Sequence, residues 1–323
     1  MKPYAVPASF FGIVLGIIGL GTAWRDAVRL WYVPTAIAET LMFIGAAVWL
    51  AVVLLYAAKW IWARDQARAE LEHPIQCCFI GLAPVSTLLT ALVVLPYSRT
   101  AALVLFWIGV AGQLAFGVYR SGRLWQGGGD PAAATAVLYL PTVAGSFVTT
   151  IVAGALGFVD VGRFFFGAGV FSWLALESII VRRFYLDPPT PPALRPSYGI
   201  QLAPPTVGAV AYLSITTGRP DLFAEALLGY GLLQALVLAR LLPWIARQPF
   251  ASSYWAFTFG VAGMSIAALR LVERGLETPA FVALAATLFV IANVVIGGIG
   301  GGTVWLLVRG RLLPPPLTVP AAN

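Results

Sequence analysis

Long apolar runs, separated by short polar stretches, make up most of the chain. Cutting the sequence at its charged residues leaves ten runs of roughly 20 residues, the length that carries a helix across a bilayer core of about 30 Å. The runs cover residues 7–24, 36–58, 74–97, 100–119, 137–159, 163–185, 199–217, 222–246, 251–270 and 278–308. This pattern predicts an all-α polytopic membrane protein with ten transmembrane helices. We expect one transmembrane domain over residues 1–323, with a short cytoplasmic tail at 309–323.

The distribution of lysine and arginine predicts the orientation. Twelve of them lie on the side of both termini: Lys2, Lys59, Arg64, Arg68, Arg120, Arg123, Arg182, Arg183, Arg195, Arg247, Arg309 and Arg311. Seven lie on the opposite side: Arg25, Arg29, Arg99, Arg163, Arg219, Arg270 and Arg274. Because cytoplasmic loops carry the excess of these residues, both termini are predicted to lie in the cytoplasm.

Odd-numbered and even-numbered runs differ in composition. Between their flanking loops the odd runs contain no Asp, Glu, Lys or Arg apart from Arg270 at the end of the ninth. They do contain residues that bend helices: Gly12, Pro84, Pro141, Pro204, Gly260 and Gly263. The backbone groups that a bend exposes are tolerated in a membrane where neighbouring helices or a water-filled cavity satisfy them. The alternation predicts five hairpins whose odd helices face a shared axis with a neutral wall, although Pro and Gly are also common in transmembrane helices generally.

The few acids within the runs lie on even-numbered ones. Glu39 and Glu225 lie near the predicted helix starts, where the helix dipole favours negative charge, and we interpret them as structural. Glu177 lies deepest, and it is the candidate coupling carboxylate if transport is driven by protons. The alternative is a structural group behind the pore, hydrogen-bonded or paired with Arg182 and Arg183.

Aromatic residues stand beside small residues on three odd runs. Phe259 precedes Gly260 in the densest aromatic stretch, Phe11 precedes Gly12, and Phe147 follows Ser146. A ring beside a bend could close a narrow pore by keeping it dry. Packing is the commoner role of an aromatic residue in a membrane helix, so this pattern alone does not single out one gate.

Composition narrows the class of protein. Hydrophobic residues make up 60% of the 323 residues and charged residues 10%, against about 45–50% and 25% in soluble domains. This excludes a soluble enzyme, and the net charge of +7 is too scattered for nucleic-acid binding. One histidine, His73, and two adjacent cysteines, Cys77 and Cys78, form neither a metal site nor a disulfide framework. We therefore expect no cofactor, no metal and no enzymatic activity.

Short strings in order along the chain resemble the tellurite-resistance/dicarboxylate transporter family, whose bacterial TehA-like members are related to plant slow anion channels. The strings are Phe11-Gly12-Ile13, Leu124-Trp125-Gln126-Gly127-Gly128, Phe165-Phe166-Gly167-Ala168-Gly169, Leu202-Ala203-Pro204, Ala211-Tyr212-Leu213-Ser214-Ile215, Gly229-Tyr230-Gly231, Leu241-Leu242-Pro243-Trp244 and Trp255-Ala256-Phe257-Thr258-Phe259-Gly260. The resemblance implies ten helices in five hairpins, a quasi-fivefold pore formed by the odd helices, and a homotrimer with one pore per protomer. It also implies that Phe259 occludes the pore.

The function hypothesis follows from these two lines of reasoning. We expect a channel-like permease that conducts small inorganic or organic anions across the bacterial inner membrane through a neutral pore. Backbone dipoles and basic rims, including Arg270 and Arg274, would favour anions without trapping them. The alternative within transport is a proton-coupled exporter of four-carbon dicarboxylates such as malate, of sulfite or of tellurite. A membrane enzyme or redox carrier would need catalytic or haem-binding residues that this chain scarcely offers.

Overall fold

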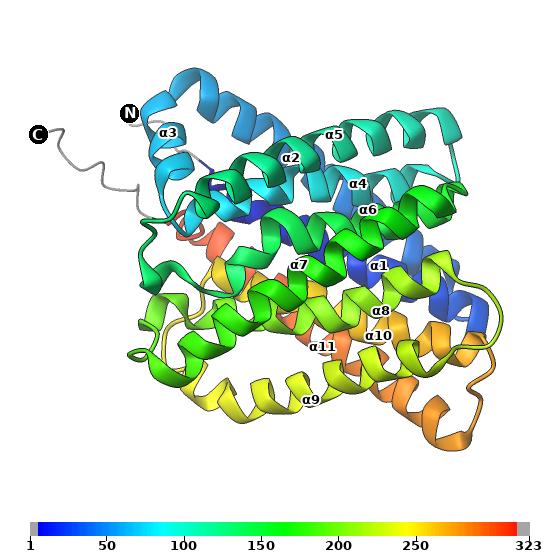
Figure 1. Ribbon diagram of the computed structural model, residues 1–323. Helices are drawn as coiled ribbons and strands as arrows, with labels where there is room; N and C mark the ends of the chain where they lie inside the picture. The colour runs from blue at the N-terminus through cyan, green and yellow to red at the C-terminus, as the bar shows by residue number, and fades with distance from the viewer. Residues whose placement is uncertain (1–5, 315–323) are drawn as a thin grey trace, which may run out of the picture.

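The computed structural model describes residues 6–314, and these residues fold into eleven α-helices without a β-strand (Figure 1). The helices are α1 Phe11–Trp31, α2 Thr35–Trp62, α3 Arg64–Glu72, α4 Leu82–Val94, α5 Arg99–Trp125, α6 Gly145–Leu156, α7 Val159–Leu186, α8 Ala203–Ile215, α9 Leu222–Ile245, α10 Thr258–Glu273 and α11 Pro279–Val308. Nine helical segments of this part of the chain are long and apolar enough to cross a membrane. The protein is thus an all-helical polytopic membrane protein. Lys2 and positions 315–323 of the expected tail lie outside the described residues.

The run expected at 199–217 is not among these nine segments. Its α-helix, α8, has 13 residues, and the eleven residues Pro192–Leu202 before it form 3₁₀ helix. At 1.5 Å per residue, α8 covers only about 20 Å, less than a bilayer core. Most of α8 is nevertheless buried inside the protein, which explains how a short helix is accommodated here.

Buried and exposed helices alternate along the chain. In the spans that contain α1, α4, α6 and α10, 67–89% of the most apolar window is buried, against 17–33% in those of α2, α5, α7, α9 and α11. Each buried helix packs against the helix that follows it in the sequence. The buried helices also pack on one another: α1 on α4 and α10, α6 on α4 and α8, and α8 on α10. The contacts among the five buried helices thus form a closed ring.

A 3₁₀ segment precedes each of the five buried helices. The 3₁₀ segments are Ala8–Phe10, Gln76–Gly81, Ala136–Tyr139, Pro192–Leu202 and Ser252–Phe257, and a π-helical turn, Leu140–Ala144, separates the third from α6. The three prolines singled out in the sequence lie at these changes of helix type and not in mid-helix. Pro84 and Pro204 lie in the first turns of α4 and α8, where proline is tolerated, and Pro141 lies in the π-helical turn.

The expectation that the first buried helix carries no charge is wrong. Helix α1 continues to Trp31, so that Arg25, Asp26 and Arg29, which the sequence pattern placed in or beside a loop, belong to it. These side chains form ion pairs that link α1 to neighbouring helices, and Arg25 with Glu39 is one of them. The helix can keep its charges because each of the three has a counter-charge.

The segment 59–73 is also more ordered than a polar link. Helix α2 runs to Trp62 and includes Lys59, and α3 occupies residues 64–72. Figure 1 places α3 at one end of the bundle, the end where the described chain begins and stops. A charged helix of nine residues gives no transmembrane signal, so cutting the chain into apolar runs missed it.

Close contact between α6 and α8 depends on Gly154. A Cβ atom at this position would lie 2.2 Å from the carbonyl oxygen of Ser214, a backbone atom that cannot turn aside. We expect Gly154→Ala to lower the free energy of unfolding by about 1–3 kcal/mol through overpacking, as measured by SDS titration in mixed micelles.

The matched control is Gly167→Ala on α7. Among the described residues, nothing lies within 4 Å of a Cβ atom at Gly167. Alanine should raise stability there by about 0.5–1 kcal/mol because it restricts the unfolded chain and favours the helix. An equal loss of stability in both variants would contradict the role assigned to the contact between α6 and α8.

Candidate functional site

A cavity of about 730 Å³ lies where the five buried helices begin. The helices line it with Gly12 and Leu15 of α1, Leu82 of α4, Phe147 of α6, Ala203, Pro204 and Val207 of α8, and Phe259 of α10. Pro7 and Pro314, near the two ends of the described chain, line it as well. Each helix thus presents its N-terminal turn to the cavity, which is the end where the helix dipole places partial positive charge.

Four of the residues singled out in the sequence line this cavity: Gly12, Phe147, Pro204 and Phe259. Phe259 is the lining residue that lies furthest along α10, and its ring is half-buried. A Cβ atom at Gly19 of α1 would lie 3.7 Å from Cδ2 of Phe259. The ring therefore extends from α10 toward α1, where a side chain at position 19 would meet it at ordinary van der Waals distance.

The other candidate residues of the buried helices make packing contacts. Phe11 is buried against the edge of the Tyr56 ring. Pro84 contacts α5, where a Cβ atom at Gly112 would lie 3.1 Å from its Cβ atom. Pro141 packs against the glycines Gly81 and Gly117, and Gly260 and Gly263 allow α10 to pack closely on Leu202, Ala203, Thr206 and Val207.

Glu177 is a hydrogen-bonded group beside the cavity, not one of its lining residues. Its carboxylate accepts hydrogen bonds from Tyr139, Trp173, Gln201 and Tyr230, which come from four different parts of the fold. Tyr139 lines the cavity and separates Glu177 from it. Of the two structural roles considered for Glu177, the structure supports hydrogen bonding and not pairing with arginine, since Arg183 donates to Thr190 instead.

The charged residues of the cavity were not found from the sequence. Lys59 and Glu70 line it, and their side chains are 5% and 2% exposed. Lys59 Nζ lies 2.8 Å from Glu70 Oε2, which also accepts from Tyr56, while Glu70 Oε1 accepts from the backbone N–H of Ala8. The pair leaves the lining without net charge. The only signal in the sequence is the i,i+3 spacing of Ala67 and Glu70, which places both on the buried face of α3.

His73 and the cysteines have the structural roles that their types suggest. Partial burial lowers the pKa of His73, so its imidazole is neutral at pH 7. The ring then accepts hydrogen bonds at Nδ1 from the N–H groups of Ile75 and Gln76 and ends α3. Cys77 and Cys78 are free and buried, and residues 6–314 hold no cluster of His, Cys, Asp and Glu suited to a metal ion.

A second cavity of about 310 Å³ is lined by the same five buried helices, closer to their C-terminal ends. Its residues include Thr22 of α1, Leu92 of α4, Ile151 of α6, Ser214 of α8 and Arg270 of α10. From Leu15 to Thr22, and likewise from Val207 to Ser214, the helices rise about 10 Å between the cavities. The two cavities thus lie at different heights along the same five helices.

Comparisons with known proteins identify the family of this chain. A family model described as SLAC1, voltage-dependent anion channel, matches residues 5–304. The chain is 36% identical over 315 residues to the tellurite resistance protein TehA homolog of Haemophilus influenzae, covering 96% of this chain and 93% of that protein. It is 26% identical over 272 residues to the S-type anion channel SLAH3 of Arabidopsis thaliana, covering 82% of this chain but 42% of that protein. It is also 26% identical over 270 residues to the uncharacterized transporter MJ0576 of Methanocaldococcus jannaschii, covering 74% and 75%.

Proposed function

Because the chain belongs to the SLAC1 voltage-dependent anion channel family, we propose that it is a channel-like permease that conducts small anions across the cytoplasmic membrane. The pathway runs along the axis of the five hairpins α1–α2, α4–α5, α6–α7, α8–α9 and α10–α11. The family is one of anion channels and not of enzymes.

One observation carries this proposal: five helix starts converge on a cavity whose lining has no net charge. Each N-terminal turn contributes partial positive charge, so the cavity favours an anion over a cation. A full positive charge would hold the anion too tightly for rapid release, whereas dipoles bind it weakly. Selectivity among anions then depends largely on the free energy of dehydrating each anion.

We assign the gate to Phe259. Its ring lines the larger cavity at the end that faces the second cavity. The ring extends toward Gly19, which lies between the two cavities along α1. A phenyl ring there blocks ions in two ways, since it fills the path and keeps it dry. Phe147, on α6, also lines the larger cavity.

The proposal includes an orientation in the membrane and an oligomeric state. The excess of Lys and Arg places both termini, and with them the larger cavity, on the cytoplasmic side of a bacterial inner membrane. We propose a homotrimer with one pore per protomer and residues 1–323 as one channel domain in each. Light scattering on the detergent complex, corrected for bound detergent, tests the trimer.

Transport of anions down their gradient is favoured over proton-coupled export by the position of Glu177. A coupling carboxylate must exchange protons with the pathway, but Tyr139 separates Glu177 from the cavity and four donors surround it. In proteoliposomes loaded with nitrate, we expect efflux that follows membrane potential and is unchanged when an ionophore abolishes the pH gradient. Efflux that stops with the pH gradient would favour the exporter.

Glu177→Gln extends the same experiment. The amide places an N–H₂ group against four donors and should destabilise the protein by about 1.5–3 kcal/mol, since hydrogen bonds to charged groups contribute about that much. Efflux per correctly folded protein should nevertheless stay within about twofold, because Glu177 does not line the cavity and so does not contact the permeating anion. A folded variant without transport would assign Glu177 a coupling role.

A further inference from the structure

The second cavity contains most of the charged residues of the buried helices. Arg25, Asp26 and Arg29 of α1 and Arg270 of α10 line it. Three positive groups thus face one negative group in a space of about 310 Å³. Such a lining differs from that of the larger cavity, where the one lysine and the one glutamate pair with each other.

Two of the three arginines are bound by carboxylates outside the cavity. Arg25 donates from Nε and Nη2 to Glu39 and from Nη1 to the carbonyl oxygen of Leu92, so each of its nitrogens has a partner. Arg29 donates from Nε and Nη2 to Glu273. Neither glutamate lines the cavity. These pairs hold the helix ends together and leave little of either charge for a ligand.

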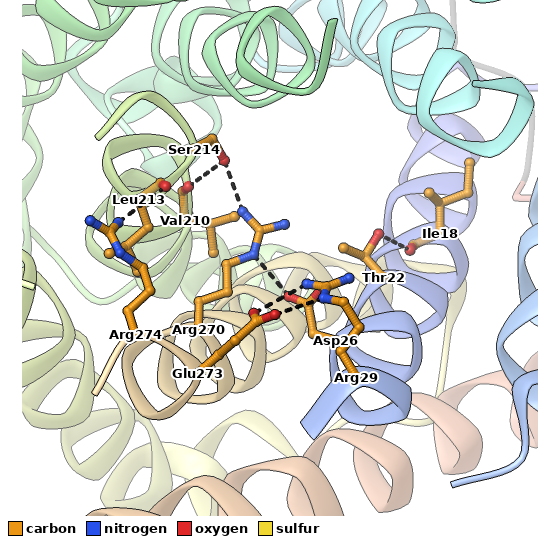
Figure 2. A network of polar contacts seen from close by, with 10 residues as sticks. All are labelled: Ile18, Thr22, Asp26, Arg29, Val210, Leu213, Ser214, Arg270, Glu273 and Arg274. Carbon is orange, nitrogen blue, oxygen red and sulfur yellow. Dashed lines mark hydrogen bonds and ion pairs between the residues drawn. The ribbon is translucent and has the colours of Figure 1, made fainter. Parts of the chain in front are cut away.

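Arg270 is held differently. Its Nε donates to Asp26 Oδ2 at 2.8 Å and its Nη1 donates to Ser214 Oγ at 2.8 Å, so it links α10 to α1 and α8 (Figure 2). Within residues 6–314 its Nη2 has no hydrogen-bond partner. Asp26 is 2% exposed and also pairs with Arg29, so its charge is shared between two arginines. The guanidinium is therefore fixed in direction, with one donor unused and its charge only partly compensated.

We propose that Arg270 binds the permeating anion in the second cavity through Nη2, while Asp26 positions the guanidinium and keeps the affinity low. The ligand class is a small monovalent inorganic anion such as nitrate or chloride. A single donor group suits one such ion, whereas a doubly charged anion loses far more hydration energy on entering than one partly compensated guanidinium returns. Low affinity lets the ion leave again, as conduction requires. This inference rests on the proposed anion pathway and gives it a second binding site.

The test measures binding without transport. Purified protein in detergent is unfolded by heat at increasing concentrations of sodium nitrate, with sodium gluconate holding the ionic strength constant, because a ligand that binds the folded state stabilises it by RT ln(1 + [L]/Kd). We expect nitrate to stabilise the native sequence. Arg270→Gln should raise the Kd for nitrate, fitted to the rise in melting temperature, about tenfold, and Asp26→Asn should lower it about tenfold, since the first removes a positive and the second a negative charge beside the ion. Arg163→Gln, an exposed arginine at the start of α7, is the control and should change nothing.

Opposite changes in nitrate affinity in the two variants distinguish a binding site from an ion pair that only stabilises the fold. If the pair is structural only, both variants melt at lower temperature and keep the same nitrate dependence, which overturns the proposal, as does a native protein that nitrate does not stabilise. Arg270→Lys covers the case in which Arg270→Gln does not fold: it keeps the charge and should bind nitrate within about threefold of the native protein. A native protein that binds nitrate in this way but does not transport anions would refute the proposed function and leave the binding site in place.

Discussion

Replacing Phe259 by alanine should convert a nearly closed pore into an open one, raising anion conductance in planar bilayers at least about tenfold. Removing the ring empties the section of the axis between the two cavities and lets water join them. The increase requires little energy, because lowering the barrier by only about 1.4 kcal/mol changes the rate tenfold. Phe259→Leu, which keeps an apolar side chain of smaller size, should give an intermediate conductance.

The matched control for this experiment is Phe257→Ala. Phe257 lies two residues earlier in the same aromatic stretch, is 7% exposed and packs against Gly199 without lining the larger cavity. Its loss should reduce the amount of folded protein and leave the conductance of each folded molecule low. An unchanged low conductance in Phe259→Ala, at a normal protein level, would remove Phe259 from the role of gate.

The open variant also reports selectivity. Reversal potentials with chloride, nitrate, sulfite and malate rank the anions without the gate. If dipoles and dehydration set the order, nitrate should pass more easily than chloride, and the doubly charged form of malate least easily. A preference for malate would favour the dicarboxylate alternative instead.

Much of the fold could be predicted because transmembrane helices leave a strong local signal. The runs of about 20 apolar residues reflect the thickness of the bilayer, which does not depend on tertiary contacts. For the same reason the signal says little about helix type. The segment 252–257 is 3₁₀ and Thr258–Glu273 is α-helical, yet both belong to one continuous apolar run. The change of type depends on how five helix starts pack around a cavity.

Charged residues within helices were the main reason why helix boundaries were predicted wrongly, because the apolar runs of the sequence were delimited by charged residues. That procedure assumes that a charge lies outside the membrane helix. Asp26 violates the assumption, since it is buried in α1 between Arg29 and Arg270, 244 positions later in the sequence. A pairing over such a distance cannot be inferred from local pattern. Within the candidate site, Phe259 was singled out by the family resemblance and Pro204 as a helix-bending residue, and both line the larger cavity.

The buried pair of Lys59 and Glu70 leads to the second large effect, a loss of stability in Glu70→Gln. The substitution leaves the Lys59 ammonium 5% exposed without a counter-charge, and breaking a buried pair in this way costs about 3–5 kcal/mol. The amide oxygen can still accept from the N–H of Ala8, so most of the loss should come from the charge and not from the hydrogen bond. SDS titration in mixed micelles measures the free energy of unfolding.

A double substitution separates charge from packing at this pair. Lys59→Met together with Glu70→Gln removes both charges and keeps similar volumes, and replacing a buried pair by groups without charge is often neutral. We therefore expect the double variant to recover most of the stability lost in Glu70→Gln alone. Stability that stays as low as in the single variant would mean that α3 is held by the hydrogen bonds from Ala8 and Tyr56 to the carboxylate.

The same double substitution tests whether the two charges cancel. In the Phe259→Ala background, it should leave nitrate conductance within about twofold of that of Phe259→Ala alone, because the lining keeps its net charge of zero.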